Sequence, residues 1–286
     1  MAGGTLYLVA TPIGNLGDVT FRAIEILRSV PLVAAEDTRI ARRLLGRYEV
    51  PSRLVSYHAR SDPRREAGLL DHLRSGADLA LVTDAGTPAV SDPGMEIAAA
   101  WAAEGGRVEA IPGPSAVLAA VVSSGIAGPR WTFEGFLPRR GRDRRERLAR
   151  LAADERGAVI FEAPGRLRAT LEDLAEACGQ DRPAAVCREL TKLHEQVVRA
   201  TLGDLGRAVA GGEIPARGEV VVVIGWVSGG ARRSVAEAAA AASEAGALAE
   251  VEALVGGGLG RVEAARRVAA ATGIPRRRLY RVDSGR

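Results

Sequence analysis

The first 120 residues repeat one pattern: a short apolar run, a loop of small and polar residues, and then an amphipathic stretch. Short apolar runs bounded by polar residues and glycine are typical of buried strands. Strands that alternate with helices predict a mainly parallel sheet. The predicted strands are 6–10, 31–35, 54–57, 78–83 and 108–111. The predicted helices are 20–28, 64–74 and 95–104, with two more that end near residues 45 and 123.

The most informative loop follows the fourth predicted strand and reads Thr83-Asp84-Ala85-Gly86-Thr87-Pro88, continuing to Ser91-Asp92-Pro93-Gly94. Small residues let a ligand approach the backbone, Gly86 permits unusual torsions, and Pro88 stiffens the exit. Ligands of open α/β sheets bind at the carboxyl ends of the strands. This loop therefore predicts a binding site, and a tight turn with a helix-capping Asp84 is the alternative.

Three other loops are expected at the same edge. The first strand ends in Thr11-Pro12-Ile13-Gly14-Asn15-Leu16-Gly17-Asp18, which matches neither the dinucleotide fingerprint nor the P-loop. The second ends in Glu36-Asp37-Thr38-Arg39, where a helix cap by Asp37 or Thr38 explains one polar residue and leaves a carboxylate for a site. The fifth ends in Pro112-Gly113-Pro114-Ser115, which suits the first turn of a helix, where free N–H groups can meet a polar ligand.

The chain divides into three predicted domains. Residues 1–123 form the α/β domain described above, and residues 124–130 resemble a hinge. A second α/β domain, 124–228, has predicted helices 142–153 and 167–178. Its strands 158–162, 184–188, 195–201 and 219–224 predict a mixed sheet. The domain at 229–286 follows a linker at 228–230 and has helices at 235–255, at 261–271 and from 275 onward. This is the outline of a small helix-turn-helix module for nucleic acid; a solubilising helical appendage is the alternative.

The net charge of +4 is concentrated in two places. Residues 231–286 hold ten arginines against six carboxylates, and residues 139–150 hold seven arginines against two. Basic patches on a neutral body suit an anionic macromolecule, whereas an ordinary solvated face is the alternative. The candidate RNA contacts are Arg139, Arg140, Arg142, Arg144, Arg145, Arg276, Arg277 and Arg278.

Lys192 is the only lysine among 39 basic residues. Lysine can be tuned to give up its proton and is a compact point charge, whereas arginine stays charged. Lys192 is therefore a candidate catalytic residue, with chance survival as the alternative. The two cysteines and three histidines show no metal-ligand spacing, so no metal site is expected. The absence of a long apolar run and of a visible signal peptide predicts a cytoplasmic protein without a membrane span.

These motifs occur together, in order, in one known family. The chain resembles the ribosomal RNA small subunit methyltransferase I family, within the tetrapyrrole-methylase-like S-adenosylmethionine enzymes. The resemblance covers nearly the whole length, including the basic tail. It rests on the loops above together with Glu134-Gly135-Phe136-Leu137-Pro138 and Arg188-Glu189-Leu190-Thr191-Lys192. The family usually has a histidine where this chain has Gly165, so this chain has no imidazole at that position.

The resemblance implies a two-lobed α/β fold of the class III methyltransferases with a small C-terminal helical domain. It implies a homodimer, with S-adenosylmethionine bound in the cleft between the lobes. The implied reaction is methylation of a cytidine ribose 2′-hydroxyl in 16S rRNA of the small ribosomal subunit. The implied cofactor contacts are Pro12, Ile13, Asp84, Ala85, Gly86, Thr87, Pro88, Pro112, Gly113, Pro114 and Ser115.

For such a reaction we hypothesise that Lys192 contacts the 2′-hydroxyl, as a base or as a charge that favours the alkoxide. Glu36 or Asp37 would orient the lysine or accept the proton, and Glu189 is a further candidate. Two other classes of function stay open. One is an enzyme of the same fold that methylates a small molecule such as a tetrapyrrole, which does not need a basic tail. The other is a non-enzymatic RNA-binding protein. A dinucleotide oxidoreductase is more remote, because the fingerprint is missing.

Overall fold

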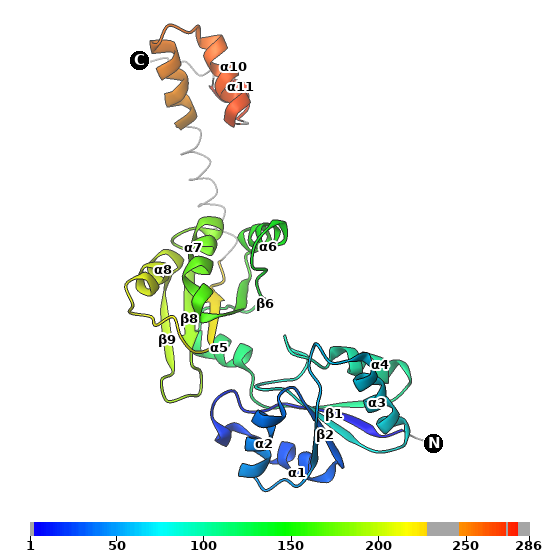
Figure 1. Ribbon diagram of the computed structural model, residues 1–286. Coiled ribbons are helices and arrows are strands. Elements are labelled where there is room, and N and C mark those ends of the chain that lie inside the picture. Colours follow the sequence, from blue (N-terminus) through cyan, green and yellow to red (C-terminus); the bar gives the residue numbers. More distant parts are fainter. Residues whose placement is uncertain (1–2, 228–245, 273, 280–286) are drawn as a thin grey trace. The chain divides into compact units, whose positions relative to one another are not determined.

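The computed structural model of the chain describes residues 3–227, 246–272 and 274–279. The chain divides into two compact units, Met1–Trp226 and Val227–Arg286 (Figure 1). The linker predicted at 228–230, the first half of the helix predicted at 235–255, and Tyr280 lie outside the described residues.

The first unit contains two sheets, and the first of them is entirely parallel. The alternating pattern of the sequence predicts the parallel pairing. The strand order, β3-β2-β4-β1-β5, is an observation of the structure. Because the strands are parallel, the loops that follow β1, β2, β4 and β5 all leave from the same edge. The strands are β1 (Thr5–Val9), β2 (Leu32–Ala35), β3 (Arg53–Ser56), β4 (Leu79–Val82) and β5 (Arg107–Ile111).

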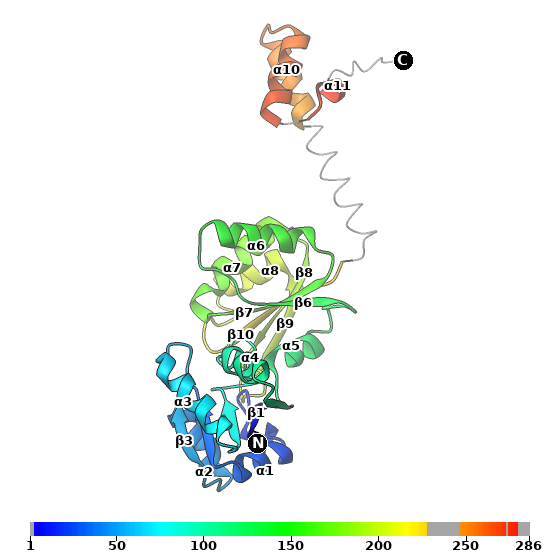
Figure 2. The ribbon, with the colours of Figure 1, turned by 90° about the vertical axis from the view of Figure 1, so that its right-hand side faces the viewer.

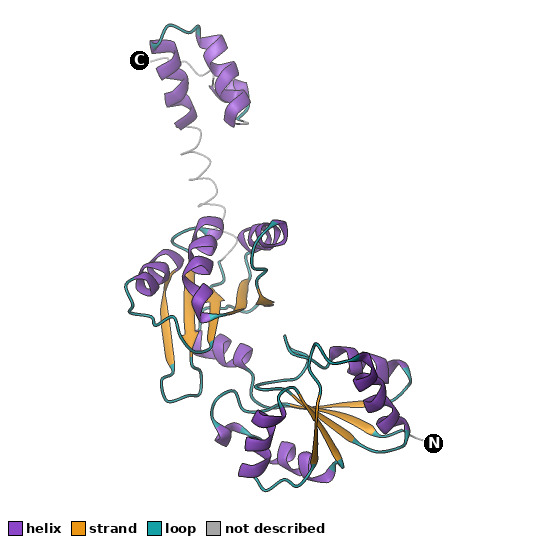
Figure 3. Cartoon of the chain, viewed as in Figure 1, coloured by secondary structure: helices purple, strands orange, loops and turns teal. Residues whose placement is uncertain are grey.

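Helices cover both faces of this sheet (Figure 3). On one face, α1 (Phe21–Ser29) and α2 (Thr38–Arg47) bury Leu27 and Leu45 against the strands. On the other face, α3 (Pro63–Arg74) and α4 (Met95–Ala103) bury Leu73 and Trp101. We call this half of the unit the first lobe.

The second lobe has a mixed sheet in the order β6-β7-β10-β8-β9, and only the β6–β7 pair is parallel. Figure 2 shows α6, α7 and α8 on one side of it and α5 on the other. Alternate valines of β10 point into these two cores. The elements are α5 (Ala116–Ser124), β6 (Trp131–Phe136), α6 (Arg142–Ala153), β7 (Gly157–Glu162), α7 (Leu167–Cys178), β8 (Pro183–Arg188), β9 (Gln196–Thr201), α8 (Leu202–Ala210) and β10 (Val220–Ile224).

Two of these elements are missing from the sequence-based prediction. The alternation of apolar and polar residues in β6 is short, because it ends at Gly135, where the pairing with β7 also shifts register. The helix α8 contains Gly203 and Gly206, which lower helix propensity, and its stability comes from burying Leu202, Leu205 and Val209. Packing overrides the local signal in both cases.

The described part of the second unit is helical. Residues 246–256 form a helix that packs with α10 (Arg261–Thr272) and α11 (Arg276–Leu279) around Val251, Val268 and Leu279. The arginines Arg276, Arg277 and Arg278 on α11 are exposed. Within the described ranges, no helix is long and apolar enough to cross a membrane.

One predicted RNA contact, Arg144, is wrong. Its residue is only 8% exposed, and its guanidinium donates to Asp173 Oδ2 at 2.7 Å, to the Pro138 carbonyl at 2.9 Å and to Thr170 Oγ1 at 3.0 Å. The Thr170 hydroxyl in turn donates to Glu162 Oε2 at 2.6 Å. Arg144 therefore holds α6 against α7 and the end of β7 and is not available to a phosphate. The sequence count could not separate it from its exposed neighbours.

We expect the Thr170→Val variant to lose on the order of 1–3 kcal/mol of unfolding free energy, because the change leaves buried polar atoms of Glu162 and Arg144 without their shared partner. Urea unfolding followed by circular dichroism measures the loss. The control is Ser29→Ala, which removes an exposed hydroxyl that bonds only its own helix, and should stay within about 0.5 kcal/mol of wild type. Equal stability of the two variants would contradict the role of Thr170.

Candidate functional site

The loops after β1, β2 and β4 bond to one another at the carboxyl edge of the first sheet. Thr11 and Gly86 exchange two backbone hydrogen bonds, of 2.8 Å and 3.0 Å. The Asp37 amide donates to Asp84 Oδ1 at 3.0 Å. The edge is therefore a connected surface, as the parallel order predicts, and Asp84 lies at its centre.

A cavity of about 440 Å³ opens between this edge and the second lobe. We call it the interlobe cavity. Its first-lobe wall is formed by the β1 and β4 loops and Glu36. Its second-lobe wall is formed by the N-terminus of α5, Phe136, Phe161–Pro164 and Gly218–Val221. Six of the eleven predicted cofactor residues line it, namely Ile13, Asp84, Ala85, Gly86, Thr87 and Ser115.

The other five predicted cofactor residues lie around this cavity. Pro12 lines the neighbouring cavity described below. Pro88, Pro112, Gly113 and Pro114 line neither cavity. Pro114 still fixes the site, because its carbonyl accepts a hydrogen bond from Thr87 Oγ1 at 3.4 Å. A Cβ on Gly113 would come within 3.0 Å of the Ala10 Cβ, so this position favours glycine.

The second cavity measures about 320 Å³, and we call it the lysine cavity. Its walls are the β1 loop, one face of α2, and the side chains of Lys192 and Glu219. It shares four lining residues with the interlobe cavity: Ile13, Asp84, Ala85 and Glu219. The two cavities therefore meet at a common wall.

Lys192 is held by two carboxylates and a glycine. Its Nζ lies 2.9 Å from Glu189 Oε1 and 3.2 Å from Glu219 Oε2. A Cβ on Gly14 would lie 2.4 Å from Lys192 Cγ, so the lysine stem packs on the bare backbone of the β1 loop. This contact joins the two lobes at the lysine cavity.

The backbone that carries Lys192 is strained. Glu189 and Thr191 adopt positive φ angles of 52° and 66°, which are rare for residues other than glycine. The buried Arg188 fixes this turn, because its guanidinium donates to Gln196 Oε1 at 3.3 Å and to the His194 carbonyl at 3.4 Å. Strain that the surrounding structure holds in place is typical of functional sites.

The charge state of Lys192 limits the roles that this side chain can have in a reaction. Burial opposes its positive charge, but the hydrogen bonds to Glu189 and Glu219 outweigh burial, and together they raise the pKa of Lys192. The hydrogen bond from Lys192 in turn lowers the pKa of Glu189. Lys192 is thus a fixed cation near neutral pH, which favours charge stabilisation over the base role.

The two predicted partners of Lys192 after β2 have other contacts. Asp37 caps α2, and its hydrogen bonds with Arg39 lower its pKa to about 2, which makes it a weak base. Glu36 lines the interlobe cavity, where burial and then the charge of Asp84 raise its pKa. The ion-pair partners of Lys192 are Glu189, which was predicted as a candidate, and Glu219, which was not.

The sequence analysis also missed Asp92 and the aromatic wall. Burial, followed by the charge of Glu36, raises the pKa of Asp92 to about 6. Phe161 packs edge-on against Phe136, with ring centroids 5.7 Å apart, and both line the interlobe cavity. The motif Ser91-Asp92-Pro93-Gly94 was an available signal for Asp92. Glu219 gave none, because its place depends on the strand order of the second sheet.

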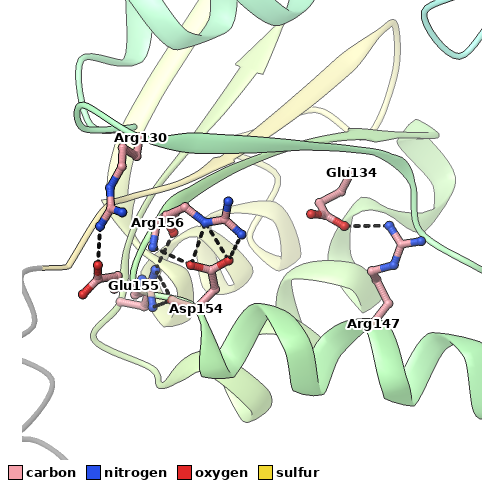
Figure 4. Close-up of polar contacts among 7 residues, drawn as sticks. Arg130, Glu134, Arg147, Asp154, Glu155 and Arg156 are labelled. Carbon is pink, nitrogen blue, oxygen red and sulfur yellow. Dashed lines mark hydrogen bonds and ion pairs between the residues drawn. The ribbon is translucent and has the colours of Figure 1, made fainter.

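Other groups in the described structure fit a ligand less well. A cavity of about 490 Å³ on the second lobe is lined by Arg147, Arg150 and Arg156. Figure 4 shows that Arg147 pairs with Glu134 and that Arg156 pairs with Asp154, both at 2.6 Å. These ion pairs cancel most of its charge. No cluster of His, Cys, Asp and Glu suited to a metal ion occurs among the residues that the structure describes.

Comparison with known proteins shows which family has this architecture. Residues 5–206 match the family of Tetrapyrrole (Corrin/Porphyrin) Methylases. The chain is 45% identical to the ribosomal RNA small subunit methyltransferase I of Synechocystis over 280 residues, which is 98% of this chain and 97% of that protein. The chain belongs to the tetrapyrrole methylase family and, within it, to the ribosomal RNA small subunit methyltransferases I. The protein of the same name from Mycobacterium tuberculosis is 43% identical over 98% of this chain and 94% of its own length.

Solved structures support the fold of this methyltransferase family member. A cobalt precorrin-4 methyltransferase matches with a TM-score of 0.60 at 21% identity, over 78% of this chain and 95% of its own. The uroporphyrin-III C-methyltransferase of Thermus thermophilus, in complex with S-adenyl homocysteine, matches with a TM-score of 0.56 at 21% identity, over 78% and 97%. The predicted two-lobed fold and family are thereby confirmed. The protein is an S-adenosylmethionine-dependent methyltransferase.

We expect the Asp92→Asn variant to gain stability relative to wild type as pH rises. In the folded state Asp92 keeps its proton up to about pH 6, above the ordinary aspartate value of 3.8. A raised carboxyl pKa contributes stability that is present below the unfolded pKa and is lost as pH rises through the folded pKa. Asparagine does not titrate, so the wild-type advantage should shrink between about pH 4 and pH 7. Urea unfolding at both pH values measures this; a constant difference would refute it.

Proposed function

We propose that this protein transfers a methyl group from S-adenosylmethionine to the ribose 2′-hydroxyl of a cytidine in 16S rRNA of the small ribosomal subunit. The observation that carries the proposal is the common wall of two cavities, one suited to the cofactor and one with a fixed cation for the acceptor oxygen. The names of the relatives, which specify small-subunit ribosomal RNA, support the choice of substrate.

The interlobe cavity has the chemistry that S-adenosylmethionine requires. Phe136, Phe161 and Val117 offer apolar contacts for an adenine ring. The carboxylates of Glu36, Asp84 and Asp92 suit the ammonium and sulfonium charges. Backbone N–H groups at the start of α5 suit a carboxylate. The cofactor supplies an activated methyl group.

In the lysine cavity, Lys192 would stabilise negative charge on the acceptor oxygen. A fixed ammonium group held by Glu189 and Glu219 needs no reorganisation when that charge develops. Loss of one such electrostatic group typically costs about 10²–10³-fold in kcat. Correct alignment of the hydroxyl by the cavity walls adds the effect of proximity.

Asp84 is the best-placed group to take the hydroxyl proton. It lines both cavities, and burial, with the nearby charge of Asp37, raises its pKa. A raised pKa makes a carboxylate a better proton acceptor. This assignment replaces the hypothesis that Glu36 or Asp37 accepts the proton. The acceptor oxygen would gain the methyl group as the S–CH₃ bond of the sulfonium breaks to leave a neutral thioether, and the O–H proton would pass to the Asp84 carboxylate.

The RNA would be held by exposed arginines outside the cavities. Arg139 and Arg140 are exposed just before α6, Arg142 and Arg145 are exposed in its first turn, and Arg276, Arg277 and Arg278 are exposed on α11. Contacts of this type add affinity that weakens as salt rises. Methylation of assembling or finished ribosomal subunits would take place in the cytoplasm.

The reaction is tested by incubating the protein with methyl-labelled S-adenosylmethionine and small ribosomal subunits that lack the modification. We expect label on the ribose of one cytidine, located by nuclease digestion. Cofactor binding without transfer to the subunits would contradict the proposed substrate. In the same assay, Lys192→Ala should lower kcat by about 10²-fold or more, since it removes the cation at the acceptor oxygen.

The control for Lys192→Ala is Arg168→Ala, which removes an exposed cation paired with Glu172 on α7. It should leave kcat within about twofold of wild type, because exposed pairs contribute little. The dissociation constant of the cofactor should be unchanged in both variants. Near-wild-type kcat for a folded Lys192→Ala protein would exclude the catalytic role.

We further propose that the protein is a homodimer that associates through the outer face of α5. Leu118 and Val122 lie one helical turn apart on α5 and are 54% and 80% exposed. Light scattering should give twice the chain mass of 29.9 kDa for wild type and a lower mass for Val122→Asp. Met95→Asp, which changes an exposed methionine on α4, is the control. A wild-type mass of one chain would rule out the dimer.

A further inference from the structure

The helix α2 carries a concentration of positive charge that the sequence analysis did not include among the RNA contacts. It contains four arginines and no carboxylate in ten residues. Arg39 pairs with Asp37, and the guanidinium of Arg47 lies 5.9 Å from the ring of Tyr48. Arg42 and Arg43 are exposed, and no side-chain hydrogen bond or ion pair to either of them occurs among the described residues.

One face of α2 lines the lysine cavity. Ile40, Arg43 and Leu44 follow the helical spacing of three and four residues and all contribute to the cavity wall. Leu16, from the β1 loop, lines the same cavity. Leu16 and Ile40 are large apolar side chains that remain 41% and 42% exposed. Apolar side chains and an uncompensated arginine therefore lie together beside Lys192.

This combination matches a nucleotide better than it matches a bare anion. A nucleotide presents an apolar face of its base and a phosphate charge a few ångströms away. Inside the cavity, Lys192 is already balanced by Glu189 and Glu219, so Arg43 is the cation that remains for a phosphate. Phosphate contacts fix the register of a nucleic acid, and unstacked bases of single-stranded RNA rest on side chains.

We propose that α2 and Leu16 form the subsite for the target nucleotide of the RNA. Leu16 and Ile40 contact the face of its base, Arg43 binds the adjacent phosphodiester, and Arg42 binds the strand as it leaves the cavity. The subsite rests on the proposed function, since it places a ribose hydroxyl beside Lys192. Its position is fixed, because the amide of Asp37, the capping residue of α2, bonds to Asp84 in the wall shared by the two cavities.

The test is a double charge reversal, Arg42→Glu with Arg43→Glu, assayed with small ribosomal subunits that lack the modification. Both side chains are exposed, so the fold should be kept. We expect the KM for subunits to rise by at least about tenfold, as removal of a charged hydrogen bond implies. The cofactor dissociation constant should not change. With Arg42→Ala and Arg43→Ala, the salt slope of RNA binding should fall by about 0.7–0.9 for each phosphate that no longer has an arginine partner.

The matched control reverses Arg64 and Arg65, two exposed arginines on α3 that line neither cavity. It changes the net charge equally, so an equal rise in KM would mean only a long-range charge effect and would overturn the subsite. Ile40→Ala tests the base contact, and we expect it to raise KM without changing the salt slope. An unchanged KM in both the Arg42→Glu/Arg43→Glu double variant and the Ile40→Ala variant would also overturn the proposal. Failure of the wild-type protein to methylate subunits would instead refute the proposed function itself.

Discussion

The contact of Lys192 with Gly14 is the interaction on which the rest of the site depends. The lysine comes from the second lobe, and the glycine from the first loop of the first lobe. The stem rests on bare backbone, while Glu189 and Glu219 hold the ammonium group. A side chain at Gly14 would overlap the stem of Lys192 and displace its ammonium group. The strained turn at Glu189 and Thr191 is stabilised by hydrogen bonds from the buried guanidinium of Arg188.

The carboxylates divide according to their surroundings. Asp37 is paired with Arg39 and stays charged, whereas burial raises the pKa of Glu36, Asp84 and Asp92. Carboxylates that cluster without nearby cations are costly to ionise together. A positively charged cofactor in the interlobe cavity would relieve this cost. The same electrostatics therefore favour a sulfonium ligand and would leave a carboxylate able to take a proton.

The sequence predicts the first lobe well, because its signals are local. Each parallel strand places the loop that follows it at the same edge of the sheet. The sequence alone therefore predicts that Ile13, Asp84 and Ser115 lie close together. The arrangement of the second lobe is harder to predict from the sequence. Glu219 reaches Lys192 only because β10 pairs antiparallel with β8, so the start of one strand lies beside the end of the other. No local pattern gives that order. The burial of Arg144 could not be predicted from the local sequence either, since it depends on Thr170 and Asp173 of another helix.

The distribution of cations agrees with the proposed RNA substrate. In the proposed reaction, the cation close to the acceptor oxygen must be compact and fixed, and Lys192 would satisfy this between two carboxylates. Cations bind phosphate most effectively when no carboxylate neutralises them, and arginine stays charged in every setting. Arg43 meets this condition only because α2 contains no acidic residue beyond its cap. Asp37 neutralises Arg39 at the first turn, so the charge that remains lies farther along α2, at the mouth of the lysine cavity. In the proposed subsite, the helix would present its charge to the strand around the target nucleotide, and the carboxylates at the edge of the sheet would remain for the cofactor.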